Sequence, residues 1–333
     1  MKKVIGILIA GFAIFIVTFL LLNKSVMDSQ LPEQSAQIEP LKAKNKEKTQ
    51  EAEIIETQSE ADAENVDKND TSSKEEVIKD SCNDFRNKHP QQEAAFNAIM
   101  AEIFMSDEDA SDTSVFTNMD WVSLNALANG GDKDALFFLG DGMAVKAIYG
   151  KDFYGPKEVR NSPSSEEIKN HKVQQEELTK GFDLLFKAGV RGKLGAFLSL
   201  QMNSDLVTRQ LIRTEPSSES EIKHSMANLI AYNRLLSFIH TKDEPFRLMF
   251  AKDAKDYYSE SIEKHYGNWK PELSSEQKAI ELKDLHKLAD QKYQSLEQKW
   301  IQQREFYGFE THPKLLDPKL EAYLMQVSEL CWS

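Results

Sequence analysis

The sequence lacks the short motifs by which enzymes and metal sites are most easily recognised. Its seven histidines include no pair with the His-x-x-x-His spacing of a helical zinc site. It contains no Gly-x-Ser-x-Gly nucleophile elbow and no phosphate-binding glycine loop. Only two cysteines are present, and neither lies in a setting typical of a nucleophile. We therefore predict no catalytic residue, no cofactor-binding residue and no metal ligand.

Two short spacings match chemical motifs but are better explained as surface pairs on a helix. Glu221 and His224 have the spacing found in di-iron bundles, which need a second copy and further glutamates. Ser220 and Lys223 fit the acyl-serine pattern, but no partner motif accompanies them. One alternative stays open: an enzyme whose catalytic carboxylates are far apart in the sequence and come together only in the folded protein.

An excess of basic residues is also missing. The formal net charge is −13 at pH 7, and an acidic protein repels phosphate backbones and anionic lipid. We therefore predict no nucleic-acid partner.

Charged residues are absent from Val4 to Leu22, a run of 19 residues. A helix of this length reaches about 28 Å, close to the hydrocarbon thickness of a bilayer. Lys2 and Lys3 precede it, which predicts that the N-terminus is cytoplasmic. A cleaved signal peptide is the alternative, although the apolar run continues beyond the small-x-small site that ends at Ala13.

Residues 1–23 are therefore expected to form an uncleaved transmembrane anchor, with the rest of the chain on the far side. Two lysines followed by a single span are common at the start of bacterial envelope proteins. We predict a single-pass inner-membrane protein whose C-terminal domain is periplasmic.

Aromatic residues are absent between Asn23 and Phe85. Residues 24–80 consist mainly of Glu, Lys, Gln, Ser, Asp and Asn, which cannot bury enough apolar surface to offset the entropy of ordering. We predict a disordered polar tether that spans about 40 Å as a coiled linker.

Strand-like alternation of apolar and polar residues is missing as well, and from Ser81 onward apolar residues recur at helical spacing. The pattern predicts an all-α domain over residues 81–333. Gly150–Ser165 is expected to be a loop. The expected helices start after His89-Pro90, cover the Trp121–Ala128 and Ala135–Met143 stripes, and include Glu166–Lys187, Lys193–Asp205, Glu219–Ile239, Glu244–Glu263 and Ser274–Gln303.

A repeated order of helix, small residues, glycine stop and new helix occurs within this domain. Glycine permits the left-handed conformation that reverses the chain, and small residues let two helices approach closely. The positions that carry the pattern are Gly131, Ala135, Leu139, Gly140, Lys187, Ala188, Gly192, Ala196 and Leu200.

At these positions the chain resembles the Sel-one-like repeat family, a relative of the tetratricopeptide repeats. The resemblance covers roughly residues 120–300. It implies antiparallel helical hairpins stacked as a short degenerate repeat array, preceded here by the transmembrane helix and the tether. A non-repetitive helical bundle, in which packing alone produces the same spacing, is the alternative.

The C-terminal third is rich in aromatic residues that could line a ligand groove. Their helical spacing favours roles in the core and in helix packing. These residues are Trp269, Tyr293, Trp300, Phe306, Tyr307 and Phe309.

Cys82 and Cys331 lie near the two ends of the predicted domain. In an oxidising compartment we expect them to form a disulfide that joins the first helix to the last segment. Two unpaired, buried thiols are the alternative.

The combination of span, tether and stacked hairpins predicts a function in binding. We expect a membrane-anchored extracytoplasmic helical-repeat protein that acts as an adaptor or scaffold in the cell envelope. Its predicted partner is another envelope protein or peptide.

Overall fold

The computed structural model describes residues 81–104, 115–116, 119–152, 162–253 and 258–331, all of which lie in one compact unit, Lys79–Ser333. Over these ranges the chain is helical with short connections and contains no strand, so the all-α prediction is confirmed for them. None of the helices described is long and apolar enough to span a bilayer. The predicted anchor, residues 1–23, and tether, residues 24–80, lie outside the described residues.

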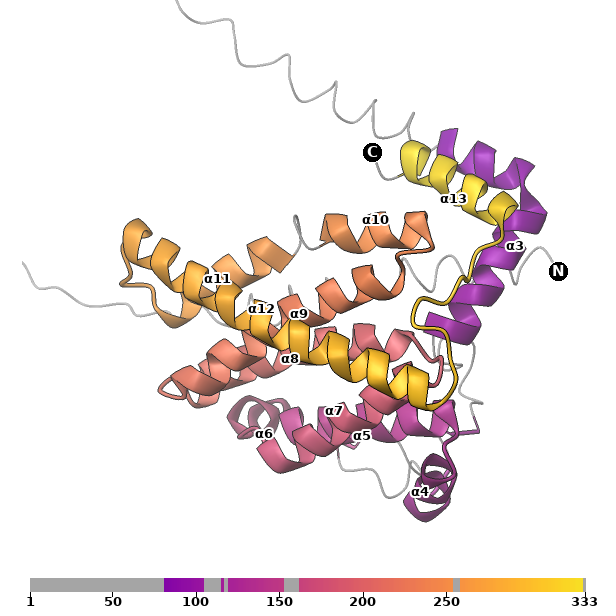
Figure 1. The fold of residues 1–333 in the computed structure, drawn as a ribbon. Helices are drawn as coiled ribbons and strands as arrows, with labels where there is room; N and C mark the ends of the chain where they lie inside the picture. The colour runs from indigo at the N-terminus through magenta and orange to yellow at the C-terminus, as the bar shows by residue number, and fades with distance from the viewer. Residues whose placement is uncertain (1–80, 105–114, 117–118, 153–161, 254–257, 332–333) are drawn as a thin grey trace, which may run out of the picture. The chain divides into compact units, whose positions relative to one another are not determined.

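A helical stretch over residues 81–88 opens the described chain. The α-helices that follow are labelled in Figure 1, and the π-helical turn η1 lies between α3 and α4 in the chain. The elements are α3 (Pro90–Ile99), η1 (Met100–Phe104), α4 (Trp121–Asn129), α5 (Lys133–Tyr149), α6 (Ser165–Asn170), α7 (Gln175–Val190), α8 (Gly195–Thr214), α9 (Glu219–Ile239), α10 (Glu244–Asp253), α11 (Ser259–Trp269), α12 (Ser275–Phe306) and α13 (Pro318–Cys331).

Side-chain caps fix where several helices begin. The carboxylates of Asp120 and Asp132 accept backbone N–H groups in the first turns of α4 and α5. Ser274 and Gln277 form a reciprocal capping box at the start of α12. Each cap satisfies donors that a helix start leaves without partners, and each is visible in the sequence.

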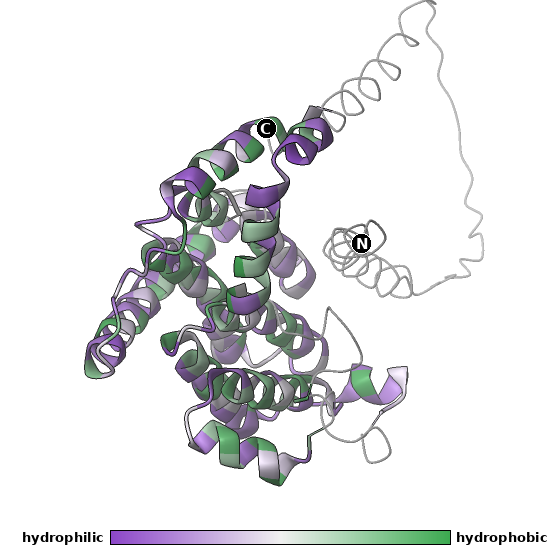
Figure 2. Cartoon of the chain, turned by 90° about the vertical axis from the view of Figure 1, so that its right-hand side faces the viewer, coloured by the Kyte–Doolittle hydropathy of each residue, from purple (hydrophilic) through white to green (hydrophobic). Residues whose placement is uncertain are grey.

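Helices that follow one another in the chain pack side by side: α4 contacts α5, α5 contacts α7, α7 contacts α8, and α8 contacts α9. The long helix α12 lies across α9 and also reaches α7 (Figure 1). Most helices carry both hydrophilic and hydrophobic residues (Figure 2), as expected when one side is buried. Helix α5 is buried around most of its circumference and packs against α4, α7 and α8.

An aromatic stack ties α7, α8 and α12 together. The ring centre of Phe197 lies 5.4 Å from that of Phe186 and 5.5 Å from that of Trp300, both edge to face. All three side chains are fully buried. Burial of such large apolar surfaces contributes a few kcal/mol each, so this stack is a main anchor of α12.

Several predicted helix boundaries need correction. The helix expected over Glu166–Lys187 is interrupted between Asn170 and Gln175, and α8 continues to Thr214 instead of stopping at Asp205. The region expected to form one helix over Glu244–Glu263 contains α10 and α11, with residues 254–257 outside the description. In contrast, α9 begins and ends where the sequence predicts, at Glu219 and Ile239.

Candidate functional site

The small residues of the repeat pattern bring α5 and α7 into backbone contact. A Cβ on Gly140 would lie 2.8 Å from the backbone nitrogen of Leu185, and one on Gly181 would lie 2.7 Å from the carbonyl oxygen of Gly140. Ala135 and Leu139, from the same pattern, are buried in the core. These positions therefore serve close helix packing.

The two glycine stops have the left-handed backbone that the pattern requires. The φ angles are +87° at Gly131 and +105° at Gly192. After Gly192 the N–H of Lys193 donates to the carbonyl of Ala188, which completes a Schellman motif at the end of α7. Of the remaining pattern residues, Ala188, Ala196 and Leu200 are buried, whereas Lys187 is exposed and pairs with Asp183.

The first and last described helices are covalently joined. A disulfide links Cys82 to Cys331, with their Cα atoms 5.3 Å apart, where the sequence predicts a bridge. Beside it the rings of Phe85 and Tyr323 stack with centres 5.6 Å apart. We call residues 81–99 and 318–331 the terminal clasp.

A partly buried polar network adds to the terminal clasp. Arg86 donates to Glu93 through Nε at 3.1 Å and through a second, shorter contact, and the hydroxyl of Tyr323 also donates to Glu93. Burial opposes the charge on Glu93, but these donors outweigh it and lower its pKa below the ordinary value. The clasp therefore holds the two ends of the described chain by covalent, aromatic and ionic contacts.

Residues 307–317, the connecting segment, run from α12 to α13 without regular structure and are held by side chains of the helices. Trp300 Nε1 donates to the carbonyl of Thr311 at 2.9 Å. Arg304 donates to the carbonyl of Glu310 through Nε and Nη2, at 2.8 and 2.6 Å. His312 Nδ1 lies 2.9 Å from the carbonyl oxygen of Phe238 in α9.

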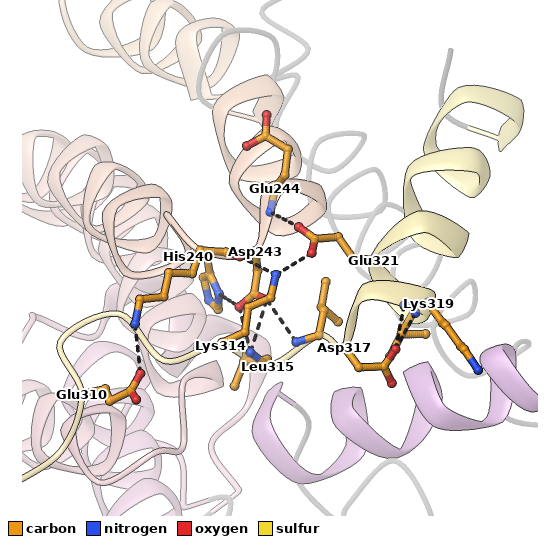
Figure 3. Close-up of polar contacts among 12 residues, drawn as sticks. His240, Asp243, Glu244, Glu310, Lys314, Leu315, Asp317, Lys319 and Glu321 are labelled. Carbon is orange, nitrogen blue, oxygen red and sulfur yellow. Dashed lines mark hydrogen bonds and ion pairs between the residues drawn. The ribbon is translucent and has the colours of Figure 1, made fainter.

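Asp243, in the turn between α9 and α10, holds the far end of this segment (Figure 3). Its carboxylate accepts the N–H groups of Leu315 and Leu316, each at 3.0 Å. Burial alone would raise the pKa of Asp243. The contact with His240, the two N–H groups and the charge of Lys314 outweigh burial and lower that pKa below its ordinary value.

The turn after α12 exposes three aromatic side chains. Gly308, at φ +71°, permits a Schellman motif in which the N–H of Phe309 donates to the carbonyl of Arg304 at 2.8 Å. The aromatic ring of Phe309 packs over the Arg304 guanidinium, 4.8 Å from Cζ to the ring centre. Phe306 and Tyr307 are the residues immediately before Gly308. We call Phe306, Tyr307 and Phe309 the aromatic surface.

These three rings correct the expectation that the C-terminal aromatics pack in the core. The exposed fractions are 82% for Phe306, 40% for Tyr307 and 41% for Phe309, whereas Trp300 is fully buried. The ring centre of Tyr307 lies 5.1 Å from that of Phe306 and 6.1 Å from that of Phe309. The three therefore form one continuous patch on the surface.

The aromatic surface is positioned by buried groups. Arg304 is only 6% exposed, and besides Glu310 it donates to the carbonyl of Val190 at the end of α7. A cation at a helix C-terminus is stabilised by the carbonyl groups there. Arg304 thus connects the turn to the end of α7, and the backbone that carries the three rings is fixed.

A second candidate cluster joins α8 to α11. His265 Nε2 lies 2.7 Å from Asp205 Oδ1, and Ser261 Oγ donates to the same oxygen at 3.0 Å. Burial would raise the pKa of Asp205, but the bond from His265 and the charge of Arg209 outweigh it and lower that pKa. Asp205 and Ser261 both face the same ring nitrogen, so the relay of a catalytic triad, which uses both ring nitrogens, is not formed.

A pocket of about 130 Å³ lies between α9, α11 and α12. Ser259, Glu263 and His286 are among its lining residues. Within the described chain no hydrogen bond connects these three side chains. Ser259 is therefore not paired with a base, as a nucleophile in covalent catalysis would be.

The spacings that resemble chemical motifs belong to a solvated helix face. His224 Nδ1 lies 2.8 Å from the carbonyl oxygen of Ser220 on an exposed turn of α9. Lys223 forms ion pairs with Glu219 and Glu281, each at 2.7 Å. No group of three or more His, Cys, Asp or Glu side chains in the described ranges could hold a metal ion.

Comparison with protein-family models, with curated proteins and with solved structures finds no match to this chain.

The packing of the described domain does not explain why the rings of the aromatic surface are exposed. An exposed, continuous apolar patch on a fixed backbone can bind a protein but offers no reacting group. The sequence shows the aromatic residues but not their exposure. The signal that could have identified it is Gly308, which ends α12 and places Phe309 outside the helix.

Proposed function

We propose that this chain is a membrane-anchored extracytoplasmic adaptor that binds an envelope protein or peptide through the aromatic surface. The observation that supports the proposal is the exposure of Phe306, Tyr307 and Phe309 on a turn that buried side chains hold in place. Aromatic residues dominate binding energy at protein interfaces, and fixed rings lose little entropy when a partner binds.

The proposal includes the arrangement expected from the sequence. Residues 1–23 anchor the chain in the inner membrane, and residues 24–80 form the tether that lets residues 81–333 search for a partner in the periplasm. The helices act as a degenerate Sel-one-like array, an assignment supported by the close packing of α5 on α7 at Gly140 and Gly181. A reporter that is active only outside the cytoplasm, fused after Ser333, should be active, and the protein should resist alkaline extraction from membranes. Release of a shorter soluble form would contradict the anchor.

Co-purification of the full chain from cells tests the adaptor function. We expect one partner in a fixed ratio with the wild type and loss of most of it with the double variant Phe306→Ser, Phe309→Ser. Ile280→Ser is the matched control, because Ile280 is also an exposed apolar residue of α12, at 63%.

The double variant should remain folded, since surface substitutions usually change the free energy of unfolding by about 0.5 kcal/mol or less. Retention of the partner by the folded double variant would contradict the proposal. Turnover of envelope substrates by the purified chain, without any stoichiometric partner, would favour the enzyme alternative.

A further inference from the structure

Arg191, the residue that ends α7, lies against the aromatic surface. Its guanidinium carbon is 4.5 Å from the ring centre of Tyr307. On its other side the guanidinium occupies the space beside Gly131, where an added Cβ would lie 2.6 Å from Nη1. The side chain is therefore held between the turn after α4 and the turn after α12.

The hydrogen-bond donors of Arg191 are available for a ligand. Within the part of the chain that the structure describes, its side chain forms no hydrogen bond and no ion pair. Arg304 beside it differs, because its Nε, Nη1 and Nη2 all donate to backbone carbonyls. Arg191 is also only partly buried, so a ligand can reach it from solvent.

Three helix C-termini, those of α4, α7 and α12, lie near this position, which accounts for two arginines there. Arg304 donates to the carbonyl of Val190 at the end of α7, whereas the fork of Arg191 has no hydrogen-bond partner among the described residues. A guanidinium stacked on an aromatic ring has a fixed orientation, and its paired N–H groups fit the two oxygens of a carboxylate.

We propose, on the premise of the adaptor function above, that Arg191 and the aromatic surface together recognise an apolar protein segment that carries a carboxylate. The carboxylate binds the fork of Arg191 through two parallel hydrogen bonds. The apolar side chain next to it packs on Phe306 and Phe309. The partner of this otherwise acidic chain is thus selected by one basic group and an apolar patch.

Saturation-transfer NMR with the full chain in detergent tests this assignment directly. The probes are two capped tripeptides, acetyl-Leu-Phe-Glu-amide and acetyl-Leu-Phe-Gln-amide, which differ only in the carboxylate. For the wild type we expect the glutamate peptide to bind about three- to fivefold more tightly, the range typical of an exposed ion pair with good geometry. Arg191→Gln should abolish this difference, and Arg191→Lys, which keeps the charge but loses the fork, should reduce it.

Circular dichroism serves as the control: both variants should keep the helical spectrum of the wild type, which would show that they fold. Equal binding of the two peptides to the wild type, or an unchanged preference in Arg191→Gln, would overturn the assignment, and so would the absence of binding by either peptide. The adaptor function is judged separately by co-purification from cells, so failure of the carboxylate assignment is distinguishable from failure of the function.

Discussion

Gly140 and Gly181 mark the point where α5 and α7 cross, and neither position has space for a side chain. An added Cβ at either glycine would approach backbone atoms of the facing helix to less than 3.0 Å, and no rotamer change relieves a backbone clash. Gly267 in α11 is the opposite case, because no atom lies within 4 Å of its added Cβ. Among the described helical glycines, Gly140 and Gly181 are thus required by backbone packing, whereas Gly267 is not.

Gly140→Ala should lower the free energy of unfolding by about 1–3 kcal/mol, because overpacking forces the helices apart. Gly267→Ala should raise it by about 0.5–1 kcal/mol, because alanine restricts the unfolded chain and favours the helix. Urea unfolding of the full chain, followed by helical circular dichroism, measures both. A stability loss of similar size in both variants would contradict the crossing geometry.

At the residue scale the sequence predicts what depends on local conformation. Gly131 and Gly192 are identified as stops because glycine alone adopts a left-handed backbone without strain. The contact between Gly140 and Gly181 depends on the register of two helices, and the free donors of Arg191 depend on three separate turns. Such relations arise from tertiary packing and have no local signal.

At the scale of elements, the interruption between α6 and α7 shows where tertiary contacts override helical periodicity. The N–H of Gln174 donates to the carbonyl of Ala147 in α5, at 3.0 Å. Gln210 of α8 donates to the carbonyls of Ile168 and His171. Partners from distant helices satisfy the backbone there, so a continuous helix is not needed. Helix α13 is not among the helices that periodicity predicts, although Asp317 and Pro318 are a recognisable start signal.

Asp243→Asn should loosen the connecting segment. The amide loses the negative charge and replaces Oδ2, which accepts the N–H of Leu315 at 3.0 Å, with an NH2 donor. We therefore expect a loss of about 1–3 kcal/mol in the free energy of unfolding at pH 7. Because the folded state lowers the pKa of Asp243, its ionised form stabilises the protein above the usual aspartate range, and this contribution is lost as pH falls through the lowered pKa. The difference between wild type and variant should therefore shrink below about pH 4. Urea unfolding at several pH values measures this difference in the free energy of unfolding. A difference that is constant down to pH 2 would contradict this role.

The terminal clasp predicts sensitivity to reductant. Cys82 and Cys331 are separated by 249 residues, so opening the bridge should lower the free energy of unfolding by about 2–5 kcal/mol. The double variant Cys82→Ser, Cys331→Ser should be equally destabilised and should not respond to reductant. Alkylation of the unfolded, unreduced protein provides an independent check: two labelled cysteines would show that the bridge does not form in cells.

At the scale of the whole molecule, the all-helical class follows from the sequence because apolar residues recur at helical spacing and alternation is missing. The stack of Phe186, Phe197 and Trp300 fastens α12 to α7 and α8, and its members come from three separate helices. The same placement of α12 fixes where its last turn emerges. Exposure of the aromatic surface is therefore a property of the assembled domain.

Photo-crosslinking in cells tests the central claim, that the aromatic surface contacts a protein partner. A photoreactive phenylalanine analogue replaces Phe306 in the full chain, and the control carries it at Ile280, an exposed position on the same helix. We predict that position 306 forms a specific adduct with one partner, that position 280 does not, and that Phe309→Ser reduces the yield. Equal adducts from both positions, or no adduct from position 306 in a correctly localised and disulfide-bonded protein, would contradict the account.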